Sequence, residues 1–146
     1  MMAERAARRN GDEQGADGVR LQQMMAGHWA AQAVYVATRL GIPDLLADGP
    51  RACDELAAAA GAHGPSLIRL LRALAGLGVF AEADDGRFAL TPMGRLLQAG
   101  APGTWRAEVL LLGEVNYRAF GDLLRTVRFG EPAFDPGRGV DRKSVV

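Results

Sequence analysis

An uncharged stretch near the beginning constrains the fold of this chain more than any other feature. The segment LQQMMAGHWAAQAVYVAT, from Leu21 to Thr38, carries no formal charge and is rich in alanine. Alanine has the highest helix propensity, so the segment predicts one long helix. Its apolar side chains do not form a single stripe: Leu21, Met25 and Trp29 share one face, and Met24, Ala31 and Tyr35 lie on others. A helix that is apolar nearly all round must be covered on several sides.

A partner subunit can supply this cover. We therefore expect a homodimer whose interface includes Leu21, Met24, Met25, Trp29 and Val36. The alternative is an ordinary core helix within one chain. A membrane span is a poor interpretation, because four polar side chains interrupt an apolar run that would need roughly 20 residues. These are Gln22, Gln23, His28 and Gln32.

The composition indicates a globular protein. At 146 residues, with 49% hydrophobic and 23% charged residues, the chain is long enough for one packed domain. The formal net charge is zero, so no overall positive field attracts nucleic acid or an anionic membrane. One cysteine, Cys53, excludes an internal disulfide framework. A reducing compartment, the cytoplasm, is the predicted location.

The two ends carry no pattern of a packed core. Residues 1–20 mix arginines with acidic residues and contain no apolar run of a signal peptide, so they predict a disordered tail. Residues 135–146 predict an irregular end. Within it, residues 141–146 hold the one lysine, Lys143, and one of the two serines, Ser144. The run DRKSVV also resembles a translated sequencing adaptor, and our hypothesis is that it is an artefact.

The middle of the chain predicts a winged helix. Asp54 and Glu55 lie in the first turn of a helix that ends at Gly61, and Pro65 begins a second helix with a wide leucine stripe up to Gly78. Residues 79–83 and 87–90 predict a hairpin, because an Asp-Asp-Gly turn joins them. Thr91 then caps a short helix through Leu97. The predicted fold class is mainly α, a winged-helix-like domain over residues 21–100 with a small β-hairpin wing and the long dimerisation helix.

A further helical stretch follows. Residues 104–129 predict a helix that can break at Gly113, and residues 101–134 form a helical linker. Spacings of three and four residues place a set of side chains on one face of this stretch: Leu112, Asn116, Phe120, Leu123 and Val127.

The combination of short motifs in this order resembles a known family. LGIPDLL, DELA, LIRLLRAL, GRFALTP and GEPAF occur together between about Leu21 and Phe134. They resemble the dimerisation domain of plant-type and bacterial S-adenosylmethionine-dependent O-methyltransferases. One departure is Ala52, where the family usually has a Ser or Thr that caps the following helix.

The resemblance implies that two subunits pair through interlocking helices and that this domain helps to roof the active site of a following Rossmann-like domain. S-adenosylmethionine would bind to that later domain, on a glycine-rich turn after a strand. The acceptor would be a hydroxyl of a small aromatic or polyketide-like natural product. This sequence would then be a fragment truncated before the catalytic domain, inactive alone.

No constellation of catalytic or metal-binding residues is expected here. Cys53 has no nearby histidine, and His28 and His63 have no carboxylate or cysteine at ligand spacing. Flat apolar side chains suit an aromatic acceptor. The resemblance implies that the first and last helices approach the acceptor pocket, and its candidate residues are Met25, Trp29, Trp105, Tyr117 and Phe120, for which core packing is the alternative role.

Two alternatives belong to other functional classes. A winged-helix transcription regulator would place residues 65–78 in the major groove of DNA, yet only Ser66, Arg69 and Arg72 are polar there. The acidic residues of the wing would repel phosphates. A salt-dependent shift of duplex DNA at submicromolar protein would support this alternative. The second is a free-standing dimerisation module without an enzyme.

Overall fold

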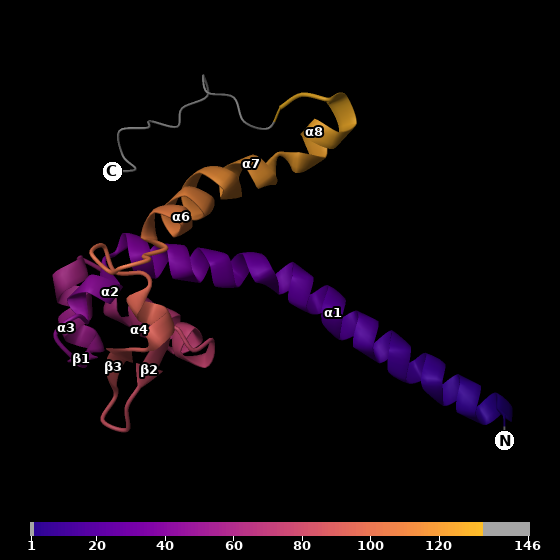
Figure 1. The fold of residues 1–146 in the computed structure, drawn as a ribbon, viewed down its shortest axis with the longest axis horizontal. Helices are drawn as coiled ribbons and strands as arrows, with labels where there is room; N and C mark the ends of the chain where they lie inside the picture. Colours follow the sequence, from indigo (N-terminus) through magenta and orange to yellow (C-terminus); the bar gives the residue numbers. More distant parts are fainter. Residues whose placement is uncertain (1, 133–146) are drawn as a thin grey trace. The chain divides into compact units, whose positions relative to one another are not determined.

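The computed structural model describes residues 2–132, with side chains from residue 15 onward. These residues belong to two compact units, Met1–Ala30 and Ala31–Val146, which are described separately (Figure 1). The predicted irregular end at residues 135–146, including the suspected artefact at 141–146, lies outside the described residues.

The first unit is helical throughout. Helix α1 extends over Met2–Arg39 and thus begins well before Leu21. A disordered tail over residues 1–20 was the prediction, and the structure differs from it. Residues 2–20 contain no proline and include several good helix formers, alanine and arginine among them. Extending an existing helix requires no new nucleation, which offsets the glycines in this segment.

The last turns of α1 begin the second unit. Thr38 is fully buried there, and its hydroxyl donates to the Val34 carbonyl at 2.8 Å. Gly41 follows with φ at +71°, in the left-handed region that favours glycine. Helix α2, Ile42–Leu45, then begins with proline in its first turn.

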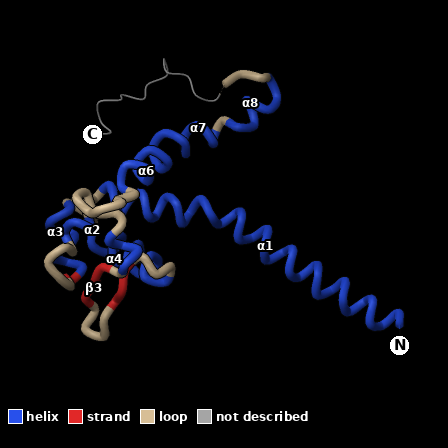
Figure 2. The backbone as a smooth tube through the Cα atoms, in the orientation of Figure 1, coloured by secondary structure: helices blue, strands red, loops and turns tan. Residues whose placement is uncertain are grey.

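A winged helix forms the body of the second unit, which confirms the predicted fold class. Helices α3, Cys53–Ala60, and α4, Gly64–Gly76, are followed by strands β2, Phe80–Glu82, and β3, Arg87–Leu90. The strands pair antiparallel around the predicted turn and appear in red in Figure 2. One strand was not predicted: β1, Arg51–Ala52, pairs with the other side of β3 and gives the order β1-β3-β2.

The core lies between the helix pair and this sheet. The side chains of Leu56, Leu71 and Leu74 are fully buried, and Phe80 and Phe88 cover them from the two strands of the wing. The wide leucine stripe predicted for α4 therefore faces the core. Burial of each such side chain stabilises the fold by about 1.5–3 kcal/mol.

Helix α3 begins with only half of a capping box. The Glu55 carboxylate accepts the Ala52 N–H at 3.1 Å, but Ala52 has no side-chain oxygen to return a bond to the first turn. Its backbone already has the extended conformation of an N-cap residue, with φ −69° and ψ 150°. Ala52→Thr should therefore raise the free energy of unfolding by about 1 kcal/mol. Urea unfolding measures this gain, and Ala52→Val, which has the same shape without the hydroxyl, should not reproduce it.

The segment after the wing is less regular than predicted. Helix α5, Pro92–Arg95, is capped by Thr91, whose hydroxyl accepts the Gly94 N–H at 3.1 Å. The helical stretch of residues 104–129, for which the sequence allowed a break at Gly113, consists of four pieces, which we call the C-terminal arm. They are α6, Arg106–Leu111; a π-helical turn, η1, Leu112–Asn116; α7, Tyr117–Gly121; and α8, Leu123–Phe129.

The π-helical turn and a break at Asp122 interrupt the apolar stripe that the sequence predicted on this arm. Regular α-helical spacing was expected to align Leu112, Asn116 and the residues that follow. The π turn inserts an extra residue into that repeat, and the backbone at Asp122 leaves the helical conformation, with φ −96° and ψ 8°. The prediction of one continuous face is therefore wrong beyond Leu112.

Candidate dimer interface and acceptor face

The first candidate surface is the apolar side of α1. Met24 and Trp29 are 74% and 70% exposed, and Leu21 and Met25 are also more than half exposed. Val36, which belongs to the second unit, is 37% exposed. An uncovered group of large apolar side chains is the usual mark of an interaction surface. All five residues expected at the dimer interface are thus accessible.

The second candidate surface lies on the C-terminal arm. Phe120 is 66% exposed, and Trp105 and Tyr117 are exposed as well. Six further apolar residues are exposed on this arm. Leu112, Leu123 and Val127 belong to the face predicted from the sequence, whereas Leu111, Leu124 and Phe129 were not singled out.

The three pocket candidates of the arm are therefore surface residues and do not belong to the core of this domain. The arm exposes too many large apolar side chains to be a simple solvated linker. Met25 and Trp29 lie in the first unit, whereas Trp105, Tyr117 and Phe120 lie in the second. Each unit thus presents its own apolar face.

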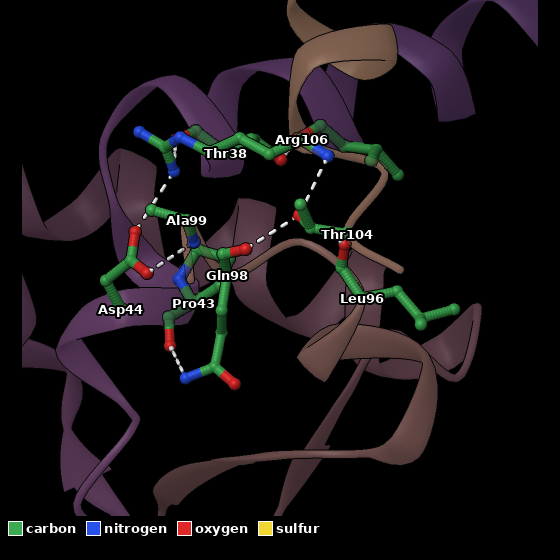
Figure 3. Close-up of polar contacts among 9 residues, drawn as sticks. Thr38, Pro43, Asp44, Leu96, Gln98, Ala99, Thr104 and Arg106 are labelled. Atoms are coloured by element: carbon green, nitrogen blue, oxygen red, sulfur yellow. Dashed lines mark hydrogen bonds and ion pairs between the residues drawn. The ribbon is translucent and has the colours of Figure 1, made fainter. Parts of the chain in front are cut away.

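A polar cluster joins the winged helix to the start of the arm (Figure 3). The Asp44 carboxylate accepts the Ala99 N–H at 2.9 Å and pairs with Arg106 at 3.0 Å. Arg106 also donates to the Thr38 carbonyl at 3.3 Å, near the C-terminal end of α1, where a cation is favourable. Thr104 donates to the Gln98 carbonyl at 2.7 Å. The cluster fixes the point from which α6 begins.

We expect Asp44→Ala to lower the free energy of unfolding by about 1–2 kcal/mol, because it removes both the ion pair and the acceptor for the Ala99 N–H. The expected loss is small for an ion pair because the Asp44 and Arg106 side chains are 39% and 27% exposed, and water screens their attraction. Asp44→Asn retains an acceptor and should cost roughly half as much. Equal losses in the two variants, measured by urea unfolding, would contradict this account.

The titratable side chains of the described residues do not form a catalytic group. Cys53 is 8% exposed, and burial raises the pKa of its thiol, with the negative charge of Asp54 raising it further. An activated cysteine nucleophile has a lowered pKa, so the raised pKa of Cys53 does not favour the reactive thiolate. His28 contacts the Met25 carbonyl, and His63 contacts the Ser66 hydroxyl. Among the described residues no group of three or more His, Cys, Asp or Glu side chains could hold a metal ion.

Helix α4 would enter the major groove if this domain bound DNA, but one of its basic side chains already forms an ion pair within the domain. Arg72 of α4 pairs with Glu82 of the wing at 2.9 Å, and this contact raises the pKa of the guanidinium. Arg87 pairs with Asp85 at 3.1 Å in the same way. Both arginines are therefore partly neutralised by neighbouring carboxylates. No helix in the described part of the chain is long and apolar enough to span a membrane.

Comparison with known proteins decides the family. The model of the O-methyltransferase dimerisation domain matches residues 22–100, the α1 C-terminal half and the winged helix. The chain belongs to this family. The resemblance carried by LGIPDLL, DELA and GRFALTP is thereby confirmed.

Two relatives of this O-methyltransferase dimerisation domain are bacterial enzymes. The phenazine O-methyltransferase of Lysobacter antibioticus is 47% identical over 115 residues, which are 79% of this chain and 34% of that protein. The 8-amino-8-demethylriboflavin N,N-dimethyltransferase of Streptomyces davaonensis is 43% identical over 79% of this chain and 33% of its own length. This chain thus spans about a third of the length of these relatives.

The solved structures agree with this result. The crystal structure of LaPhzM matches with a TM-score of 0.79 and 45% identity over 84% of this chain and 37% of that one. A solved relative, the methyltransferase CalO1 of calicheamicin biosynthesis, is in its S-adenosylhomocysteine-bound form. The family fold of the dimerisation domain therefore extends through most of the described residues.

The described residues do not fit such a cofactor. S-adenosylmethionine enzymes of the expected type need a glycine-rich turn between a strand and a helix. Strand β1 leads into α3 through Ala52 and Cys53, and β3 leads into α5 through Thr91 and Pro92, with no glycine at either junction. We therefore assign no cofactor contact to any described residue of this dimerisation domain.

Proposed function

We propose that this chain pairs two subunits of an S-adenosylmethionine-dependent O-methyltransferase. One observation carries the proposal: the dimerisation domain has large apolar side chains uncovered on α1, including Met24, Met25 and Trp29. They lie in the first unit, whose described residues form a single helix with no core of its own to cover them. A homodimer with twofold symmetry would bury both copies of this surface at once.

The proposed reaction takes place on a part of the enzyme outside this sequence, because the chain covers only about a third of its relatives. The acceptor would be a hydroxyl of a flat aromatic or polyketide-like natural product. The relatives support an aromatic acceptor, since one acts on a phenazine and another on an aminoflavin. The second transfers methyl groups to nitrogen, so the hydroxyl specificity is the part that an assay must establish.

The acceptor would lie against the exposed aromatic side chains of the arm. Trp105, Tyr117 and Phe120 offer rings of the right size to stack on such a molecule. Met25 and Trp29 are the candidates that α1 of the partner subunit would contribute. The cytoplasm is the proposed location, since the chain has a single cysteine and gains nothing from an oxidising compartment.

A calorimetric titration tests whether this chain only pairs the subunits and leaves cofactor binding to another part of the enzyme. We expect no heat of binding when S-adenosylmethionine is added to the 146-residue chain, and no methyl transfer to aromatic hydroxyls. The uninterrupted gene should encode, after this domain, a strand, a glycine-rich turn and an acidic residue roughly 20 positions further on. Its product should bind the cofactor and methylate a phenolic acceptor. Saturable binding of micromolar cofactor by the 146-residue chain would contradict the proposal.

A further inference from the structure

The π-helical turn of the arm is held by side chains of α1. The Tyr117 N–H donates to the Leu112 carbonyl, five residues back, and so does not serve the Gly113 carbonyl, which would be its partner in an α-helix. The Gln32 side-chain amide donates to that carbonyl at 2.9 Å. A polar side chain therefore satisfies the oxygen that the altered repeat deprives of its usual donor.

The same turn approaches α1 more closely than any residue with a side chain would permit. Gly113 is buried, and a Cβ added to it would overlap the ring and the Cβ of Tyr35. Tyr35 continues past the glycine, and its hydroxyl donates to the Glu114 carboxylate at 3.4 Å. Glycine weakens the interior of a helix, so this contact gives the physical reason for a glycine here.

A π turn changes which side chains face outward. One extra residue in a turn rotates the following helix by about 100° relative to a continuous α-helix. Tyr117 and Phe120 follow directly after the turn, and both are exposed. Their direction therefore depends on whether the turn is π-helical or α-helical.

We propose that Gln32, Tyr35, Gly113 and Glu114 form a register latch, a contact that keeps the turn π-helical and so sets the face on which α7 and α8 present their apolar side chains. The four are positioning residues. That this face meets an aromatic acceptor rests on the proposed function. The latch itself does not, since all its contacts lie within one unit of one chain.

Amide hydrogen exchange, followed by NMR, tests the latch directly. Gln32→Leu removes the amide donor at similar volume, and Gly113→Ala forces the backbone away from Tyr35. Both should accelerate exchange of the amides of residues 117–120 at least tenfold, with changes below twofold at Leu71 and Phe88 in the core. The carbonyl carbon resonance of Gly113 should also shift in Gln32→Leu, because it loses a donor.

Two matched variants serve as controls. Gly121→Ala changes an arm glycine with open space around it, and Gln22→Leu changes an exposed glutamine of α1 outside the latch. Neither should alter exchange at residues 117–120 by more than twofold. Unchanged exchange there in Gln32→Leu, or equal acceleration in the core, would overturn the proposal.

Self-association separates this proposal from the proposed function. The proposed pairing is through α1, so if the unmodified chain is a dimer, the two latch variants should remain dimeric while amide exchange at residues 117–120 accelerates. If the unmodified chain is monomeric, the pairing function fails, yet the exchange measurement still decides whether the latch exists.

Discussion

Replacing Met25 and Trp29 together with glutamate is expected to convert the dimer into a monomer. Both side chains are more than half exposed in the single chain, so the change leaves the fold intact and puts charge into the interface. Central interface residues of this kind contribute about 2 kcal/mol or more each. Because about 1.4 kcal/mol corresponds to a tenfold change in dissociation constant, the double variant should bind its partner roughly a thousandfold more weakly.

The control introduces the same charges elsewhere. Leu77 and Met93 are 51% and 53% exposed, and they belong to the winged-helix part of the sequence rather than to α1 or the arm. Leu77→Glu with Met93→Glu should leave the dimer unchanged in sedimentation velocity. Dissociation of this control to the same extent would show that added charge, rather than the α1 surface, is responsible.

The second large effect concerns the junction of the wing and α5. A Cβ at Gly94 would overlap the Val79 carbonyl oxygen and lie 3.1 Å from a methyl group of Leu90. The Thr91 hydroxyl bonds to this carbonyl at 2.8 Å, so the backbone there has little freedom to yield. We expect Gly94→Ala to destabilise the domain by about 3 kcal/mol, which is a drop of roughly 10 °C in Tm.

Gly76 provides the matched comparison. It is also in a helix, but a Cβ there would meet no atom within 4 Å. Gly76→Ala should be neutral or slightly stabilising, because alanine favours the helix by up to about 1 kcal/mol over glycine. If thermal unfolding shows the same Tm for both variants, the packing assigned to Gly94 is wrong.

Local signals in the sequence were sufficient for most of the winged helix. The turn at Asp84, Asp85 and Gly86 and the cap at Thr91 act on their immediate neighbours, and the structure has both as predicted. The leucine repeat of α4 likewise specifies its buried face without knowledge of the partner. These features needed only residues within a few positions of one another.

Features that depend on distant partners were not predicted. Strand β1 has two residues and exists because Arg51 pairs with Phe88, far along the chain. The π turn likewise depends on Gln32 and Tyr35, which contact Gly113 from α1. Neither short segment carries a periodic pattern of its own, so propensity alone could not reveal them.

The candidate surface was only partly predictable. The uncharged run from Leu21 to Thr38 pointed to α1, since too many of its faces are apolar for one small core. The apolar residues of the arm were instead interpreted as a helical stripe. The π turn and the break at Asp122 interrupt that stripe, and the spacing of the sequence does not show either of them.

Sedimentation equilibrium of the unmodified chain near 10 micromolar tests the central claim most directly. This concentration is about tenfold above a micromolar dissociation constant, which corresponds to roughly 8 kcal/mol of association free energy. The pairing account predicts a species of twice the 15.5 kDa mass of one chain. A well-folded monomer of 15.5 kDa under these conditions would contradict it.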